Sequence, residues 1–312
     1  MTKRTEIAMK NLVIKMGIVL LLVIGLLMLF YSTDDFNELE EKENTATREV
    51  KPVNPVLTEG AGSYVGKDID DWTETYGYPE RIYAADNKYQ HYIYRLADAF
   101  YDVRVRERQI GMIYATGVEA DIAPLSVNQR AAEIYQGTSI NTEPVIRTAD
   151  GDYHLELSEA DMKTQLLIRY GKVYMQVYID RLSGRVMAAR FMTPDMLVQM
   201  QPYTAHLNGR PLERTIKKVR PLLQQLNEQE TLTAVINMMR ANYEVHNLTA
   251  AASVKPLCQS QGAALSSGNG YDAAEVVNDW LNSSDRDMML NSQYDRIQTA
   301  VKGCYAVRYL NE

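Results

Sequence analysis

Short runs in which apolar and polar residues alternate constrain the fold of this chain more than any other feature of its sequence. Such runs occupy residues 90–95, 100–106, 109–115, 163–170, 172–179 and 185–192. Alternation with a period of two is typical of antiparallel strands with one buried face. Glycines lie at or near the turns between the runs, namely Gly111, Gly117, Gly171 and Gly184. The pattern therefore predicts two sets of antiparallel strands.

A short predicted helix precedes each set of strands. One covers residues 68–76 and ends at Gly77, and the other covers 126–136 and ends at Gly137. A capping residue at the start and a glycine at the end are typical of helix boundaries. The two closing glycines are 60 residues apart, which indicates an internal duplication of a helix-plus-meander unit. The domain so defined covers residues 64–200, with repeats at about 64–120 and 121–200.

An apolar segment near the N-terminus is long enough to cross a bilayer. Residues 16–33 carry no charge, and the span covers 12–31 because the Lys15 ammonium can reach toward the headgroups. Basic residues precede the segment and acidic residues follow it, so the positive-inside rule predicts a cytoplasmic N-terminus and an extracellular remainder. A cleaved signal peptide is the alternative, but no small-x-small cleavage site follows. We expect residues 1–32 to be a cytoplasmic tail and a transmembrane signal anchor.

The segment after the anchor is polar and acidic. Residues 33–63 are rich in Glu, Thr, Asn, Pro and Gly without an apolar period, which predicts a flexible acidic stalk. The charged run at 34–49 has two interpretations, a binding arm and a solvated spacer, and the spacer is the commoner. Residues 33–312 hold 29 basic and 39 acidic residues, a formal net charge of −10. Nucleic acid and anionic lipid headgroups require clustered Lys and Arg, so the charge argues against both as partners.

A second domain is predicted after a proline-containing connector. The connector covers residues 201–228 and includes a short predicted helix at 214–225, and the second domain covers 229–312. Its predicted elements are helices at 230–243, 254–265 and 273–281 and a closing strand at 301–310.

Both cysteines, Cys258 and Cys304, belong to this second domain. On the extracellular side of a membrane, oxidising conditions favour a disulfide between them. Two unpaired buried thiols are the alternative. If formed, the bridge would join the predicted second helix to the closing strand.

The sequence WLNSSDRDMML at residues 280–290 resembles the W-[LM]-x-S-x-x-H-R-x-x-[IM]-L segment of the CAP superfamily. This superfamily comprises the cysteine-rich secretory, antigen 5 and pathogenesis-related 1 proteins. The segment is one residue shorter than the pattern between the serine and the arginine, and the positions that then follow the pattern are Trp280, Ser283, Arg286, Met289 and Leu290. Asp285 stands where the superfamily has a histidine, and Asn237 and Arg240 resemble the N-x-x-R of its first helix.

The resemblance implies an α-β-α sandwich, in many members with a cleft lined by two histidines and two acidic residues. Such a set can hold Zn²⁺ or transfer protons. Here Asp285 replaces one histidine, and the segment that should carry the other shrinks to SSGNGYD between Leu265 and Ala273. Glu275 is the one weak candidate for an acidic member. We therefore expect a shortened, degenerate CAP-like domain with no metal, no cofactor and no enzymatic activity.

The earlier part of the chain opens with VGKDIDDW and continues with a G-x-P-x-R turn at Gly77, Pro79 and Arg81, a tyrosine-rich strand and a closing apolar strand. These features resemble the N-terminal CAP-associated domain of membrane-anchored or secreted proteins of Gram-positive bacteria. The resemblance covers roughly residues 64–200. In that family the domain precedes a CAP domain. The expected fold class is thus α+β: a transmembrane helix, a duplicated helix-plus-antiparallel-meander domain and a shortened CAP-like α-β-α sandwich.

Other candidate sites are weak. The four histidines, His91, His154, His206 and His246, lack metal-ligand spacing, and we interpret each as an ordinary surface or half-buried residue. No G-x-S-x-G elbow, P-loop, G-x-G-x-x-G fingerprint or H-E-x-x-H helix is present in the sequence. Tyrosines are abundant, with 15 of 21 between residues 64 and 203. They are suited to recognition, although tyrosine also covers half-buried sheet faces.

Together these features predict a single-pass cell-surface protein that acts as a non-enzymatic binding or interaction module of the envelope. Its partners would be the membrane, through residues 12–31, and a cell-wall component, a lipid or an envelope protein. Two alternatives stay open. One is a cell-wall or peptide hydrolase with an unidentified site, and the other is a regulatory partner of another membrane protein.

Overall fold

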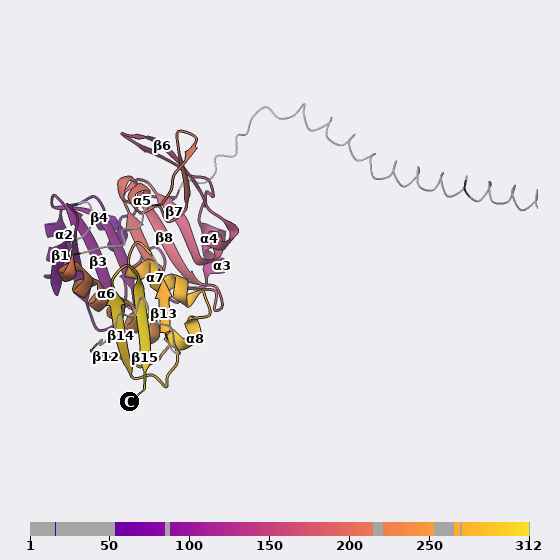
Figure 1. Ribbon diagram of the computed structural model, residues 1–312. Helices are drawn as coiled ribbons and strands as arrows, with labels where there is room; N and C mark the ends of the chain where they lie inside the picture. The colour runs from indigo at the N-terminus through magenta and orange to yellow at the C-terminus, as the bar shows by residue number, and fades with distance from the viewer. Residues whose placement is uncertain are drawn as a thin grey trace, which may run out of the picture. The chain divides into compact units, whose positions relative to one another are not determined.

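The computed structural model describes Met16 and residues 54–84, 88–214, 221–252, 265–268 and 270–311 (Figure 1). The chain divides into two compact units, 1–51 and 52–312. The first holds Met16 alone among the described residues, so the predicted anchor and most of the stalk lie outside them. Across the ranges given above, none of the helices combines the length and the apolar character needed to cross a bilayer.

The first half of the CAP-associated region contains a 3-10 helix η2 (Ala61–Tyr64), α2 (Ile69–Tyr76), β1 (Arg81–Ala84), β2 (Gln90–Arg95), β3 (Phe100–Arg106) and β4 (Gln109–Thr116). The helix α2 and the three strands β2, β3 and β4 are those that its sequence predicts, whereas η2 and β1 were not predicted, and η2 begins within the predicted stalk. The Asp68 carboxylate caps α2 by accepting a hydrogen bond from the Asp70 amide, and Gly77 ends the helix with a φ of 76°. Both predicted boundaries of this helix are therefore confirmed.

The second half contains more elements than the first. They are α3 (Ala131–Gly137), β5 (Val145–Thr148), β6 (Gly151–Glu156), α4 (Glu159–Thr164), β7 (Gln165–Tyr170), β8 (Val173–Asp180), β9 (Arg185–Met192), α5 (Pro194–Met200), β10 (Thr204–Leu207) and β11 (Arg210–Pro211). The strand predicted from residue 163 begins at Gln165, because a Ser158–Asp161 capping box starts helix α4 immediately before it. The predicted connector is not a simple linker, since β10 pairs with β6.

The long sheet has the strand order β1-β2-β3-β4-β9-β8-β7 and is antiparallel throughout. The two halves meet where β4 pairs with β9, with Tyr114 opposite Arg190. Each half contributes a hairpin with one bulge, between Arg104 and Val105 in β3 and between Tyr178 and Ile179 in β8. A duplicated unit would give this symmetry, although the duplication itself stays a prediction.

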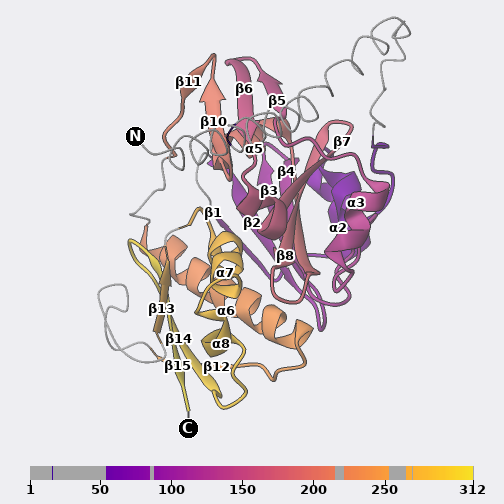
Figure 2. The same cartoon turned by 90° about the vertical axis from the view of Figure 1, so that its right-hand side faces the viewer.

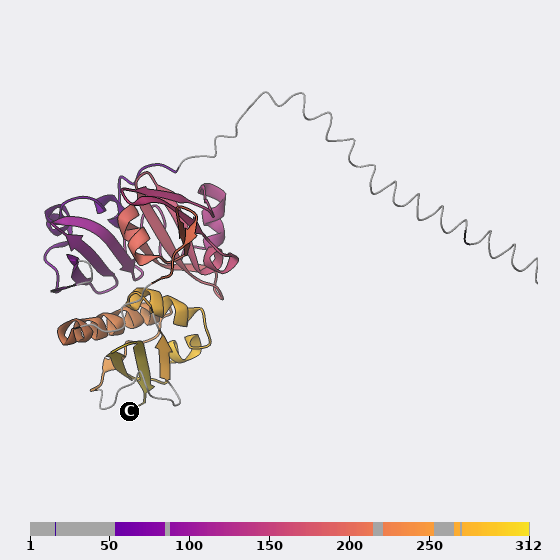
Figure 3. The ribbon, with the colours of Figure 1, turned by 45° about the horizontal axis from the view of Figure 1, so that its top comes forward.

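The two faces of the long sheet are both covered. Helices α2 and α3 lie on one face (Figure 2), where Trp72 and Ile134 belong to one buried apolar cluster with the strand residues Val103, Ile113 and Phe191. The other face packs against helices of the C-terminal region, which separate it from a second sheet (Figure 3). Sequence alternation would expose this face to solvent, and its burial is the main feature of the fold that alternation alone does not predict.

The C-terminal region contains α6 (Leu222–Asn242), β12 (Thr249–Ala250), β13 (Leu265–Gly268), α7 (Ala273–Leu281), α8 (Arg286–Met289), β14 (Arg296–Val301) and β15 (Tyr305–Leu310). Its sheet has the order β12-β14-β15-β13. Two predictions were wrong here. Helix α6 is continuous where a connector helix and a separate helix were expected. The single closing strand is a hairpin, because Gly303 takes a φ of 76° and turns the chain.

The predicted helix at 254–265 lies outside the described residues except for Leu265, which begins β13. Cys258 lies in the same range. Cys304 is half-buried in the turn between β14 and β15, beside Ala300 and Ala306. The disulfide and the third layer of the sandwich therefore stay predictions, whereas the mixed α+β class with antiparallel sheets is confirmed.

Candidate functional site

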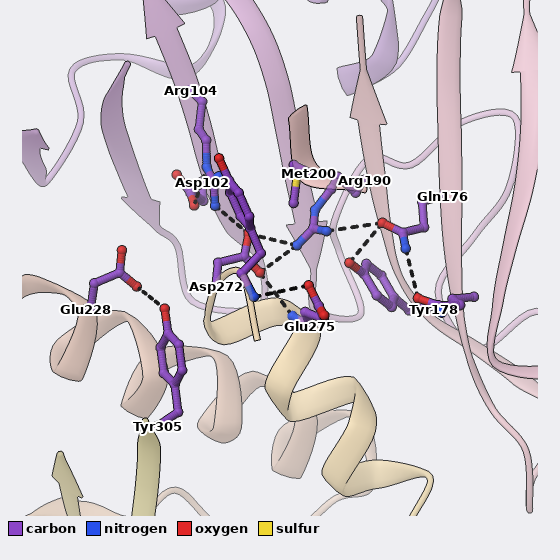
Figure 4. Close-up of polar contacts among 12 residues, drawn as sticks. Asp102, Arg104, Gln176, Tyr178, Arg190, Met200, Glu228, Asp272, Glu275 and Tyr305 are labelled. Carbon is purple, nitrogen blue, oxygen red and sulfur yellow. Dashed lines mark hydrogen bonds and ion pairs between the residues drawn. The ribbon is translucent and has the colours of Figure 1, made fainter. Parts of the chain in front are cut away.

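The most unusual chemical feature is a cluster of buried charges between the long sheet and helix α7 (Figure 4). Arg190 on β9 donates to both carboxylate oxygens of Asp272, at 2.7 and 2.9 Å. Arg104 on β3 donates to the same carboxylate. Arg190 is 0% exposed and Asp272 is 5% exposed. Two cations and one anion are thus removed from water together.

The sheet fixes the position of Arg190. This residue lies at the central β4–β9 pairing, and its guanidinium carbon is 5.9 Å from the ring centroid of Tyr114 and 5.3 Å from that of Tyr178. Its Nη1 also donates to Gln176 Oε1 at 3.1 Å. Aromatic faces attract a guanidinium cation, so these contacts offset part of its desolvation.

Helix α7 fixes the position of Asp272. Asp272 is the N-cap, and its Oδ1 accepts a hydrogen bond from the Glu275 amide at 3.1 Å. Burial opposes ionisation of this carboxyl, but the positive charges of Arg190 and Arg104 outweigh it and hold the pKa of Asp272 well below its usual range. Glu275 in turn accepts from both terminal nitrogens of Arg214, at 2.5 and 2.6 Å.

A second branch of the cluster joins the sheet to helix α6. His91 on β2 is 3% exposed, and its Nδ1 lies 2.7 Å from Asp102 Oδ1. Its Nε2 lies 3.7 Å from Glu228 Oε1, and its ring stacks on Tyr83 at 4.4 Å between centroids. The interpretation of His91 as a surface or half-buried residue was therefore wrong, because helix α6 covers the strand that carries it.

Sequence reasoning missed this cluster. Asp102 and Arg104 alternate with apolar residues in FYDVRVR, a pattern that favours a solvent-facing side for the charged residues. One signal was available in the sequence. Asp102 and Arg104 place an acid and a base two residues apart on one strand, and the second half of the domain carries another arginine, Arg190. A partner surface was needed to interpret it.

The residues of the CAP-like motif lie in two different environments. Asp285 precedes α8 and is half-buried. Burial raises its pKa, and the nearby Ser266 hydroxyl partly offsets this effect. Arg286 instead forms an ion pair with Asp180 at the end of β8, with 3.1 Å between Nη2 and Oδ2. Part of the motif therefore docks the C-terminal region onto the long sheet.

Neighbouring groups strengthen this docking. Asn282 accepts a hydrogen bond from the Arg181 amide at 2.8 Å and donates to the Ile179 carbonyl at 3.0 Å. The Tyr243 hydroxyl donates to Asp180 at 2.5 Å. Within the motif itself, Ser283 donates to the Trp280 carbonyl at 3.0 Å. Trp280 is buried in the core, while Leu290 packs against it from a half-buried position.

Asn237 and Arg240 organise the loops around helix α6. Asn237 pairs with the backbone of Leu248 in both directions, at 2.9 and 3.0 Å. The fully buried Arg240 donates to four backbone carbonyls, those of His246, Met289, Asn291 and Tyr294. Both residues thus have structural roles at the positions that the resemblance identified.

The predicted CAP-associated turn also reaches the C-terminal region. Gly77 ends α2, and Arg81 on β1 forms an ion pair with Glu230 of helix α6. The Arg81 Nη2 lies 3.3 Å from Thr231 Oγ1. Across the described part of the chain, no group of three or more His, Cys, Asp and Glu side chains is arranged to hold a metal ion.

Comparisons with known proteins agree with these features. The family described as CAP-associated N-terminal matches residues 65–203. A crystal structure of a cysteine-rich secretory protein from Staphylococcus aureus superposes with a TM-score of 0.77 and 30% identity, covering 83% of this chain and 98% of that chain. An extracellular SCP-domain protein from Bacillus anthracis gives a TM-score of 0.71 at 17% identity, covering 86% and 100%, and shows the shared fold.

These matches define the class: the chain belongs to the CAP superfamily of cysteine-rich secretory proteins and carries a CAP-associated N-terminal domain. Both resemblances inferred from the sequence are thereby confirmed. Among individual proteins, the chain is similar to the uncharacterized membrane protein YlbC of Bacillus subtilis. The two are 23% identical over 339 residues, which covers 95% of this chain and 97% of YlbC.

Proposed function

We propose that this protein is a membrane-anchored envelope protein whose CAP-like domain acts as a non-enzymatic binding or interaction module. The proposal rests on the identity and the contacts of two residues of the CAP motif. Asp285 occupies the histidine position, and Arg286 is committed to Asp180 of the neighbouring domain. A residue of the motif beside the expected cleft, Arg286, thus serves to join two domains.

The buried cluster supports the same interpretation. Arg104 and Arg190 from one domain donate hydrogen bonds to Asp272 from the other, and all three side chains are buried. A charge cluster of this kind is costly to separate, because each ion would be left without its partner. The two domains would therefore present one fixed surface to a cell-wall component, a lipid or an envelope protein.

The anchor is proposed from the apolar segment at 12–31, its flanking charges and the similarity to a protein described as a membrane protein. We expect a tag placed after residue 312 to be digested by protease added to intact protoplasts. A tag before residue 1 should be digested only after lysis, because the basic flank retains it in the cytoplasm. Protection of the C-terminal tag in intact protoplasts would contradict this topology.

We expect no zinc chemistry, and the test uses the full-length chain purified in detergent with zinc present throughout. A catalytic zinc needs about three N, O or S ligands and an open position, and Asp285 is a single carboxylate at the degenerate site. We expect far less than one zinc per chain and no hydrolysis of cell wall or peptide. Asp285→Ala should behave like the parent. Stoichiometric zinc or hydrolysis that this substitution removes would favour the hydrolase alternative.

The kind of partner requires a separate experiment. Crosslinking in living cells and pull-down on purified cell wall would be compared for the same tagged chain. Retention on the wall supports direct envelope binding. A single crosslinked membrane protein, with no wall retention, would favour the regulatory alternative.

A further inference from the structure

A polar cavity lies in the CAP-associated domain, on residues that the function proposed above does not use. Its volume is about 130 Å³. The β3–β4 hairpin supplies Arg106 and Gln109, the chain before β2 supplies Tyr89, and the first turn of α5 supplies Asp195. Gly66 also lines the cavity, so four separate segments of the chain form its walls.

Tyr89 is a buried residue in the wall of this cavity. It is 4% exposed, and its ring lies against the backbone of Gly111. A Cβ at position 111 would come within 2.7 Å of Tyr89 Cε1 and 2.9 Å of its hydroxyl, so only glycine leaves room for the ring. Within the described residues, the Tyr89 hydroxyl makes no hydrogen bond. Burial raises the pKa of Tyr89, which keeps the hydroxyl protonated as a donor.

Arg106 supplies a positive charge over the ring of Tyr89. Its guanidinium carbon is 4.8 Å from the Tyr89 ring centroid. That cation–π contact is its one polar interaction among the described residues, where it makes no hydrogen bond or ion pair. An arginine normally satisfies several donors, so this guanidinium has donors available for a carboxylate.

Asp195 supplies a negative charge on another wall. It lines the same cavity as Arg106, yet the two form no ion pair across the residues described here. Glu107 also lines the cavity. Two carboxylates beside one guanidinium disfavour a simple anion, and the guanidinium disfavours a simple cation. A molecule with both charges satisfies both walls.

The volume limits the size of such a molecule. A cavity of about 150 Å³ holds benzene, which has six heavy atoms. A free amino acid such as alanine has the same number of heavy atoms and carries an ammonium and a carboxylate. We propose that this cavity binds a free small α-amino acid, with its carboxylate on Arg106 and Tyr89 and its ammonium facing Asp195.

Binding is tested by equilibrium dialysis of the full-length protein against radiolabelled D-alanine, L-alanine and glycine. Propionate and ethylammonium serve as single-charge probes. We expect millimolar or tighter binding of at least one amino acid, and at least tenfold weaker binding of both single-charge probes. Propionate binding as tight as alanine, or no amino-acid binding up to about 50 mM, would overturn the proposal.

Substitutions test which side chain contacts each charged group of the amino acid. Arg106→Gln should weaken amino-acid binding at least tenfold, and Asp195→Asn should weaken it while leaving propionate binding unchanged or tighter. Arg108→Gln is the matched control, because Arg108 lies on the same hairpin but pairs with Asp68 and Asp70 outside the cavity. Unchanged binding by Asp195→Asn would exclude the ammonium contact. Asp195 is exposed, so this variant tests the proposal even if Arg106→Gln does not fold.

Discussion

Replacing Asp272 by asparagine is expected to lower the free energy of unfolding by about 3–5 kcal/mol. Asparagine keeps the size of the side chain but removes the negative charge. Arg190 is then buried without an anionic partner, and Arg104 keeps only Asp102, at 3.8 Å. The measurement is chemical denaturation at pH 7. Asp70→Asn is the matched control, since Asp70 pairs with Arg108 at the surface, and it should cost less than about 1 kcal/mol.

The same substitution should change the pH dependence of stability. The folded-state pKa of Asp272 is lowered, so its contribution is complete above the unfolded pKa of about 3.9 and is lost as the pH falls. The difference between the parent and Asp272→Asn should therefore shrink below about pH 4. A difference that is small at pH 7, or that persists unchanged into acid, would show that the cluster does not hold the domains together.

Arg240→Met should produce the second largest loss, about 3–4 kcal/mol, measured by the same denaturation experiment. Methionine fills much of the space of the apolar stem but donates nothing to the four carbonyls that Arg240 contacts. Lysine should rescue only part of the loss, because a single ammonium cannot match the planar fork of donors.

Arg296→Met is the control for that loss, because Arg296 is exposed at the start of β14. Its free energy of unfolding should stay within about 0.5 kcal/mol of the parent. Equal losses for the two variants would mean that Arg240 acts only through general charge effects and not through its hydrogen bonds.

Local sequence predicts the elements that depend on local physics. The alternation in β2, β3 and β9 is strong enough to place these strands, and the Asp68 cap and Gly77 place helix α2. The prediction was wrong where one short sequence pattern was compatible with two structures. Residues 301–310 contain an apolar strand pattern, but the positive φ of Gly303 converts it into a hairpin.

The candidate site was only partly predictable. The motif WLNSSDRDMML predicts that Asp285 replaces the histidine of the superfamily, and it singles out Arg286 and Trp280. It did not show that Arg286 would pair with Asp180, a residue 106 positions away. Contacts over such distances depend on how two domains pack, and nothing in the local sequence around either residue specifies the other.

The sequence by itself determined the strands, the capped helices, the apolar segment at 12–31 and the family, because each depends on periodicity, capping chemistry or a linear motif. The tertiary structure alone decided that the charged face of the long sheet is buried. On one strand, Asp102 and Arg104 have the pattern of solvent-facing residues. Asp272 and helix α6 turn them into an interior cluster, because buried charges require partners that distant segments supply.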